Sequence, residues 1–89
     1  MKIKLELFGA SKDLSDKEFL EFNLEEKSSI KELRKTIINY VDQNFKGNNN
    51  LKKIIETSAF CSEDNNIVSE SYQINKDQKI GIIPPIGGG

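Results

Sequence analysis

The chain has 89 residues, of which 36% are hydrophobic, 30% charged and 8% aromatic. A chain of this length buries roughly 60–65% of its unfolded surface in one core, so we expect one small domain and no second one. The 13 Lys and Arg residues against 14 Asp and Glu give a net charge of −1, which argues against nucleic acid as a partner because that partner normally requires a broad positive field.

Scarce residue types limit the chemistry of this chain. It contains no His, the commonest general base and zinc ligand, and its single cysteine, Cys61, cannot form an internal disulfide. No run approaches the roughly 20 apolar residues of a membrane helix, and charges interrupt the start where a signal peptide has its apolar run. We therefore expect no metal, no membrane contact and a cytoplasmic location.

Two strands are predicted near the start of the chain. Apolar residues alternate with charged ones over residues 3–7, which is the period-two pattern of a half-buried strand. The same alternation returns over residues 20–24, after a predicted turn or loop at residues 9–13. The two strands are expected to form a hairpin with a long connection.

A capping box predicts the start of the main helix. Ser29 and Glu32 have the spacing at which each side chain satisfies an unpaired backbone N–H of the other residue. The helix is expected to end near Gly47 after about four to five turns. Its apolar residues recur at helical spacing and form one stripe: Ile30, Leu33, Ile37 and Val41. Its basic residues lie off that stripe and mark either a solvated face or a surface for an acidic partner: Lys31, Arg34 and Lys35.

The second half of the chain has weaker signals. Its segments are predicted, in order, as a short helix around residues 51–55, a short strand at 59–61, a turn at 63–66, a brief strand at 67–68, a turn at 75–78 and a last strand at 79–83. This order of elements is that of an α+β domain with one main helix on one face of a mixed sheet. A β-grasp arrangement, with the first and last strands parallel, fits it best.

The uncovered face of that sheet is a candidate surface for a partner. In this arrangement Phe8 and Ile83 face away from the helix, and Ile67 is a further candidate. Large apolar side chains on an open face suggest a surface that another protein covers. Scattered exposure of single apolar residues is the alternative, because it is ordinary in proteins.

The last six residues carry the candidate reactive group. We place the domain boundary after residue 83, so that residues 84–89 form a flexible tail. Pro84 and Pro85 cannot donate the hydrogen bonds of a strand, and they favour an extended exit. Ile86, Gly87 and Gly88 would then thread a bare Gly89 carboxylate into a cleft of another protein, because glycine permits the closest approach of backbone. A frayed, inert end is the alternative explanation.

At this point the sequence resembles a known family. The ending Ile82-Ile83-Pro84-Pro85-Ile86-Gly87-Gly88-Gly89 is similar to the terminus of the small, sulfur-carrying subunit of molybdopterin synthase. Residues 3–10, 29–34 and 75–80 resemble the first strand, the helix opening and the last turn of that family. A terminal Gly-Gly also occurs in ubiquitin-like modifiers and in the thiamine sulfur carrier, whereas the two prolines favour the molybdopterin branch. Residues 48–50 and 61–66 depart from the pattern.

The resemblance implies a ubiquitin-like sulfur carrier that binds no cofactor and is not catalytic alone. In the family, an E1-like adenylyltransferase uses ATP to adenylate the terminal carboxylate, which here is that of Gly89. A sulfurtransferase or another persulfide source then supplies the sulfur of a thiocarboxylate. The large synthase subunit uses that sulfur to convert a pterin precursor into molybdopterin during molybdenum cofactor biosynthesis. A thiamine-type carrier, a protein-conjugating modifier and a non-reactive interaction domain are the alternatives.

The residues of the chain agree with activation by a partner. A carboxylate is a poor electrophile, and the sequence has neither a Gly-rich phosphate loop after a strand nor a Walker lysine with which to bind ATP. A thiol relay through Cys61 is a minor alternative. Its acidic neighbours Glu63 and Asp64 do not favour a reactive thiolate, so a small buried side chain is expected there.

Overall fold

The computed structural model describes residues 1–85, and residues 86–89 lie outside the described part. Strands β1, β2, β4, β5 and β7 form one sheet in the order β2-β1-β7-β4-β5, and β3 pairs with β6 in a small second sheet. The elements, in chain order, are β1 (Lys2–Leu7), the 3₁₀ helix η1 (Gly9–Leu14), β2 (Phe19–Asn23), β3 (Ser28–Ser29), α1 (Ile30–Asn44), α2 (Asn49–Thr57), β4 (Ala59–Cys61), β5 (Ile67–Val68), β6 (Gln73–Ile74) and β7 (Gln78–Ile83).

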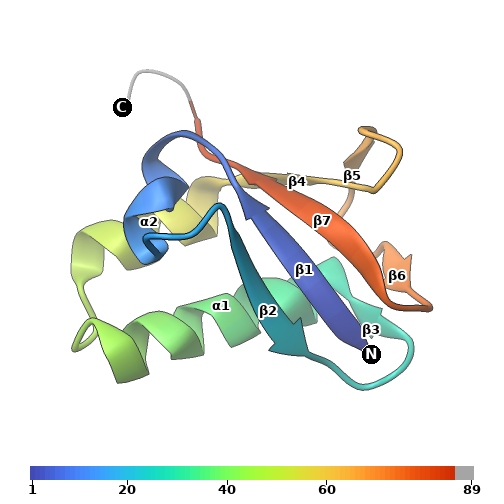
Figure 1. Ribbon diagram of the computed structural model, residues 1–89, viewed down its shortest axis with the longest axis horizontal. Helices are drawn as coiled ribbons and strands as arrows, with labels where there is room; N and C mark the ends of the chain where they lie inside the picture. Colours follow the sequence, from blue (N-terminus) through green and yellow to red (C-terminus); the bar gives the residue numbers. More distant parts are fainter. Residues whose placement is uncertain (86–89) are drawn as a thin grey trace.

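Strand β1 lies between β2 and β7 and determines the register of both. It pairs antiparallel with β2, so that Leu5 lies opposite Leu20, and parallel with β7, so that Leu5 also lies opposite Ile80. Figure 1 shows β1 and β7 side by side and running in the same direction. The predicted hairpin and the predicted parallel pairing of the first and last strands are both confirmed.

Helices α1 and α2 cover one face of the five-stranded sheet (Figure 1). The predicted apolar stripe of α1 is buried against the predicted inward-facing residues of β1 and β7. Burial of each such side chain is worth about 1.5–3 kcal/mol, so this layer is the main source of stability. The residues concerned are at most 2% exposed: Ile3, Leu5, Leu7, Ile30, Leu33, Ile37, Val41, Ile80 and Ile82. The layout is that of the predicted β-grasp domain.

The predicted ends of α1 are confirmed. The Glu32 N–H donates to the Ser29 hydroxyl at 3.3 Å, and the Ser29 N–H donates to the Glu32 carboxylate at 3.2 Å. At the other end the helix stops at Asn44, and Gly47 adopts φ +68°, a conformation that costs glycine little.

Two features differ from the expectation. Residues 9–14 form η1 where the sequence indicated a turn or loop, and burial of Leu14 and Ser11 in the folded domain holds that segment. Strands β3 and β6 were not predicted at all. Each has two residues, which is too short for any periodicity to show in a sequence.

Arg34 corrects the expectation for the basic residues of α1. Its side chain is 16% exposed and is therefore not on a solvated face. The guanidinium Nη1 donates to the carbonyl oxygens of Ile55, Glu56 and Ser58 at 2.6, 3.1 and 2.8 Å, and the Glu70 carboxylate pairs with the same guanidinium. These carbonyls lie at the end of α2, where the last carbonyls of a helix lack an N–H group four residues further on. The Ile55 carbonyl also accepts from the Ser58 N–H at 3.4 Å. Arg34 thus ties α1 to the end of α2.

The neighbours of Arg34 behave as expected. Lys31 and Lys35 are exposed, and no ion pair is found for either within residues 1–85. None of the helices in the described part has the length and apolar character that a membrane crossing requires.

We predict that Arg34→Met destabilises the domain by about 1.5–3 kcal/mol, because the substitution keeps the aliphatic stem but removes charged donors from the carbonyl oxygens at the end of α2, two of which are partly buried. Urea unfolding followed by circular dichroism measures the change. Lys35→Met, on the exposed side of the same helix, is the matched control and should stay within about 0.5 kcal/mol of the wild type. Equal effects of the two substitutions would contradict this role of Arg34.

Candidate functional site

The alternation of side chains along each strand decides which residues lie on the face of the sheet opposite the helices. In β7, Ile80 and Ile82 point into the core, so Gly81 and Ile83 point to the other face. The register places Gly81 opposite Cys61 and Ile83 opposite Ala59 of β4. Ile83 therefore lies on the open face, as the alternation predicts.

Phe8 lies on the same face, one residue beyond β1. Its backbone is extended, with φ −121° and ψ 152°, so the alternation of β1 continues to it. Its ring lies over Gly81: a Cβ added to Gly81 would be 3.0 Å from Cε2 of Phe8 and 2.7 Å from Sγ of Cys61. The missing side chain of Gly81 therefore makes room for both neighbours. Phe8 remains 40% exposed.

The sequence analysis missed Ser11, which holds the backbone of Phe8. The Phe8 N–H donates to the Ser11 hydroxyl at 2.9 Å, and that hydroxyl donates to the Phe8 carbonyl at 2.5 Å. Ser11 itself is fully buried. Serine side chains often form hydrogen bonds with the backbone of a residue a few positions away. The spacing of Phe8 and Ser11 was therefore the available signal in the sequence. Ser11 therefore fixes the backbone from which the exposed aromatic ring projects.

Ile67 extends this surface to the edge of the sheet. It pairs with Cys61 across β5 and β4 and is 64% exposed. Residues contributed by the end of β1 and by β7, β4 and β5 thus share one face, which we call the apolar patch: Phe8, Ala59, Cys61, Ile67, Gly81 and Ile83. The structure brings together the three residues predicted for a partner surface. Whether a partner covers them stays a prediction.

Charged side chains lie on the same open face along β1, β2 and β7, and one of them, Glu6, lies opposite Gly81 of the apolar patch. The Lys79 ammonium lies 3.4 Å from the Glu6 carboxylate, and that of Lys2 lies 4.0 Å from Glu21. Exposed pairs of this kind add little stability. Charges that border an apolar patch would instead orient a protein that docks on it.

The chain leaves the sheet next to the apolar patch. Pro84 follows Ile83 and is buried, whereas Pro85 is exposed. The Cδ atom of Pro84 is 3.8 Å from the position that a Cβ of Gly9 would occupy. Figure 1 shows β7 leaving the sheet beside the connection from β1 to η1. The other predicted tail residues lie outside the described part: Ile86, Gly87, Gly88 and Gly89.

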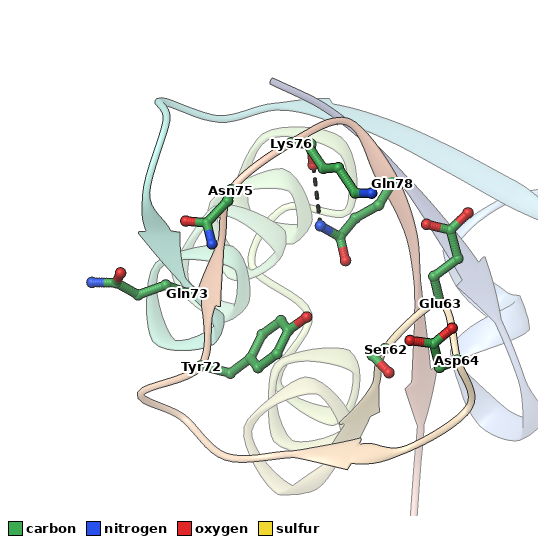
Figure 2. A pocket seen from close by; sticks show the side chains of 8 residues that line it. All are labelled: Ser62, Glu63, Asp64, Tyr72, Gln73, Asn75, Lys76 and Gln78. Carbon is green, nitrogen blue, oxygen red and sulfur yellow. Dashed lines mark hydrogen bonds between the residues drawn. The ribbon is translucent and has the colours of Figure 1, made fainter.

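A polar recess of about 220 Å³ lies at the opposite end of β7. Figure 2 shows that its walls come from the turn after β4 on one side and from the segment between β6 and β7 on the other. Gln78 in its wall begins β7 and donates to the Lys76 carbonyl at 3.2 Å. The length of a six-residue strand, on the order of 20 Å, separates this recess from the exit at Pro84. The recess therefore cannot act directly on the base of the tail.

Cys61 is 8% exposed, in accord with the expected small buried side chain. Within residues 1–85, no three His, Cys, Asp or Glu side chains are grouped so that they could hold a metal ion.

Several solved structures share this arrangement. A Pyrococcus furiosus protein assigned as molybdopterin converting factor, subunit 1, has 17% identity and a TM-score of 0.70 over 96% of this chain and 98% of its own. SAMP1 from Haloferax volcanii has 8% identity and a TM-score of 0.70 over the whole of both chains. The ubiquitin of Caldiarchaeum subterraneum has 16% identity and a TM-score of 0.62 over 100% of this chain and 98% of its own.

The chain has the ubiquitin-like β-grasp fold. The predicted fold class is confirmed, and the resemblance read from the sequence points to the same structural group. No protein-family model matches the chain, and no curated protein matches it. At these identities the likeness establishes the fold.

We predict that Gly81→Ala destabilises the domain by about 1–3 kcal/mol, because the added methyl group overlaps Cys61 and the ring of Phe8. Thermal or urea unfolding measures the change. Adding Cys61→Ala removes the nearest atom and should restore at least half of the loss. A double variant no more stable than Gly81→Ala alone would show that the crowding lies elsewhere.

Proposed function

We propose that this protein is a sulfur carrier, the small subunit of a molybdopterin synthase, and that its reactive group is the carboxylate of Gly89. One observation carries the proposal: the Pro-Pro-Ile-Gly-Gly-Gly ending follows directly from β7, a central strand of a β-grasp sheet, beside an exposed apolar patch. The Pyrococcus neighbour, assigned as a molybdopterin converting factor subunit, supports the choice of pathway.

The chemistry begins on a partner. The Gly89 carboxylate attacks the α-phosphorus of ATP on an E1-like adenylyltransferase, and pyrophosphate leaves. The outer sulfur of a persulfide on a sulfurtransferase then attacks the acyl carbon, and AMP leaves. A thiol cleaves the resulting acyl disulfide: the thiocarboxylate is released, and the thiol and the sulfurtransferase cysteine are oxidised to a disulfide. The resulting thiocarboxylate is a tethered nucleophile for the pterin precursor, held by the large subunit at high effective concentration. The carrier itself is a co-substrate, binds no cofactor and works in the cytoplasm.

The apolar patch is the proposed docking surface for both partners. Phe8 and Ile83 lie next to the base of the tail, so a protein that covers them also receives the chain end. An aromatic side chain backed by a rigid sheet is a typical anchor of an interface. Ile67 would extend the contact to the edge of the sheet.

A protein-conjugating modifier is the second candidate. The ubiquitin among the structural neighbours supports it, because the same fold and a terminal glycine would serve it equally well. Adenylation is common to both candidates, and the acceptor distinguishes them. A thiamine-type carrier and an interaction domain with an inert end are the remaining alternatives.

We predict that intact-mass analysis of the protein purified from its own cells finds a fraction with one terminal oxygen replaced by sulfur. Deletion of Gly88 and Gly89 should abolish both this species and molybdopterin formation in the reconstituted complex, while the circular dichroism spectrum stays unchanged. Attachment of Gly89 to lysines of other proteins would favour the modifier. If the chain without Gly88 and Gly89 kept full activity, its end would be inert, and an interaction domain would be the remaining interpretation.

We predict that Phe8→Ala weakens binding to the adenylyltransferase by about 30-fold or more, as expected for an anchor residue. Isothermal titration calorimetry with the purified partner measures the Kd. Lys2→Ala is the control, because Lys2 is exposed on the same face at the opposite end of β1 from Phe8. It should change the Kd by less than about threefold. Similar losses for the two variants would place the interface elsewhere on the sheet.

A further inference from the structure

Pro84 belongs to the folded domain although it follows the last strand. Its ring is buried, and Cδ and Cγ lie 3.8 and 3.9 Å from the Cβ position of Gly9. Gly9 adopts φ +54°, which turns the chain from β1 into η1. An L side chain is strained in that conformation, so glycine permits this turn beside the ring of Pro84.

The surface under Pro84 is itself held firmly. Ser11 bonds both backbone groups of Phe8, the residue directly before Gly9. The ring of Phe8 is in turn packed over Gly81 of β7, two residues before Ile83. The end of β1 and the end of β7 therefore brace each other at the point where the tail begins.

We propose that Pro84 anchors the base of the tail on Gly9 and thereby sets the reach of the reactive end. Pro84 and Gly9 are then positioning residues for the reaction of Gly89, an inference that rests on the proposed function. With the base held at Pro84, five residues of sequence, Pro85 to Gly89, carry the terminal carboxylate. Fully extended, they span at most about 18 Å.

The benefit of an anchored base is geometric. A reactive end on a short tether samples a small volume, which raises its effective concentration in the partner's cleft. A displacement of about 1 Å at a reacting atom can cost about 100-fold in rate. If Pro84 were not anchored, the last pairs of β7 with β4 could open and lengthen the tether. Anchor and tail length are therefore coupled in this proposal.

A double-mutant cycle between Pro84→Ala and deletion of Gly87 tests that coupling. The full-length chain is incubated with the E1-like adenylyltransferase of its source organism and ATP, and pyrophosphate release gives kcat and KM. We expect the deletion to lower kcat by about 100-fold in the wild type, with KM for the carrier within about twofold because the docking patch is intact. In the Pro84→Ala background the deletion should cost less than about tenfold, because the loosened strand end supplies the missing length.

Pro85→Ala is the matched control, since Pro85 is the adjacent exposed proline. In that background the deletion should cost as much as it does in the wild type, whatever Pro85 itself contributes. Amide hydrogen exchange gives a second measurement that needs no partner. Pro84→Ala, but not Pro85→Ala, should speed exchange at the pair of Ala59 and Ile83 by about tenfold.

The outcomes separate the two proposals. Additive effects of Pro84→Ala and the deletion, in a chain that is adenylated normally, would overturn the anchoring role and leave the proposed function intact. A deletion that costs the wild type less than about threefold would do the same. No adenylation of the wild-type chain would remove the proposed function, and the positioning role with it.

Discussion

The parallel pairing of β1 with β7 is the interaction on which the candidate site depends. Parallel strands end at the same edge of a sheet, and the pair of Leu7 with Ile82 sets how closely the two ends meet. Phe8 and Gly9 at the end of β1 consequently lie beside Ile83 and Pro84, which come from the other end of the sequence. An exposed aromatic residue and the base of the tail are thus neighbours because of the topology.

A parallel pair requires a long crossover, and here the crossover also forms the core. Helices α1 and α2 span it and cover one face of the sheet, while Arg34 joins α1 to the end of α2 and to Glu70. The guanidinium also lies 4.8 Å from the ring centroid of Phe60 in β4, the strand that pairs with β7. The same side chain therefore connects the helical layer to the part of the sheet that carries the tail.

The opposite face is left without a cover, and its two halves differ in character. Towards the start of β1 it carries the ion pair of Lys2 with Glu21, and towards the exit of the chain it carries Phe8, Ile67 and Ile83. Because the apolar half adjoins the base of the tail, a protein that buries it would receive the chain end in a defined direction. In the proposed function, docking and delivery of the tail would therefore depend on one surface.

The sequence alone determined the fold class, the start of α1 and the core residues of β1, α1 and β7, because alternation, helical spacing and the capping box of Ser29 are local patterns. It did not identify Leu14, Phe60 or Ile74, which the fold also buries. It also singled out Phe8, Ile67, Ile83 and the tail as the candidate site. Tertiary structure decided the rest. The role of Arg34, the clamp of Ser11 on Phe8 and the contact of Pro84 with Gly9 join residues through packing and side-chain bonds, which leave no periodic signal in a sequence.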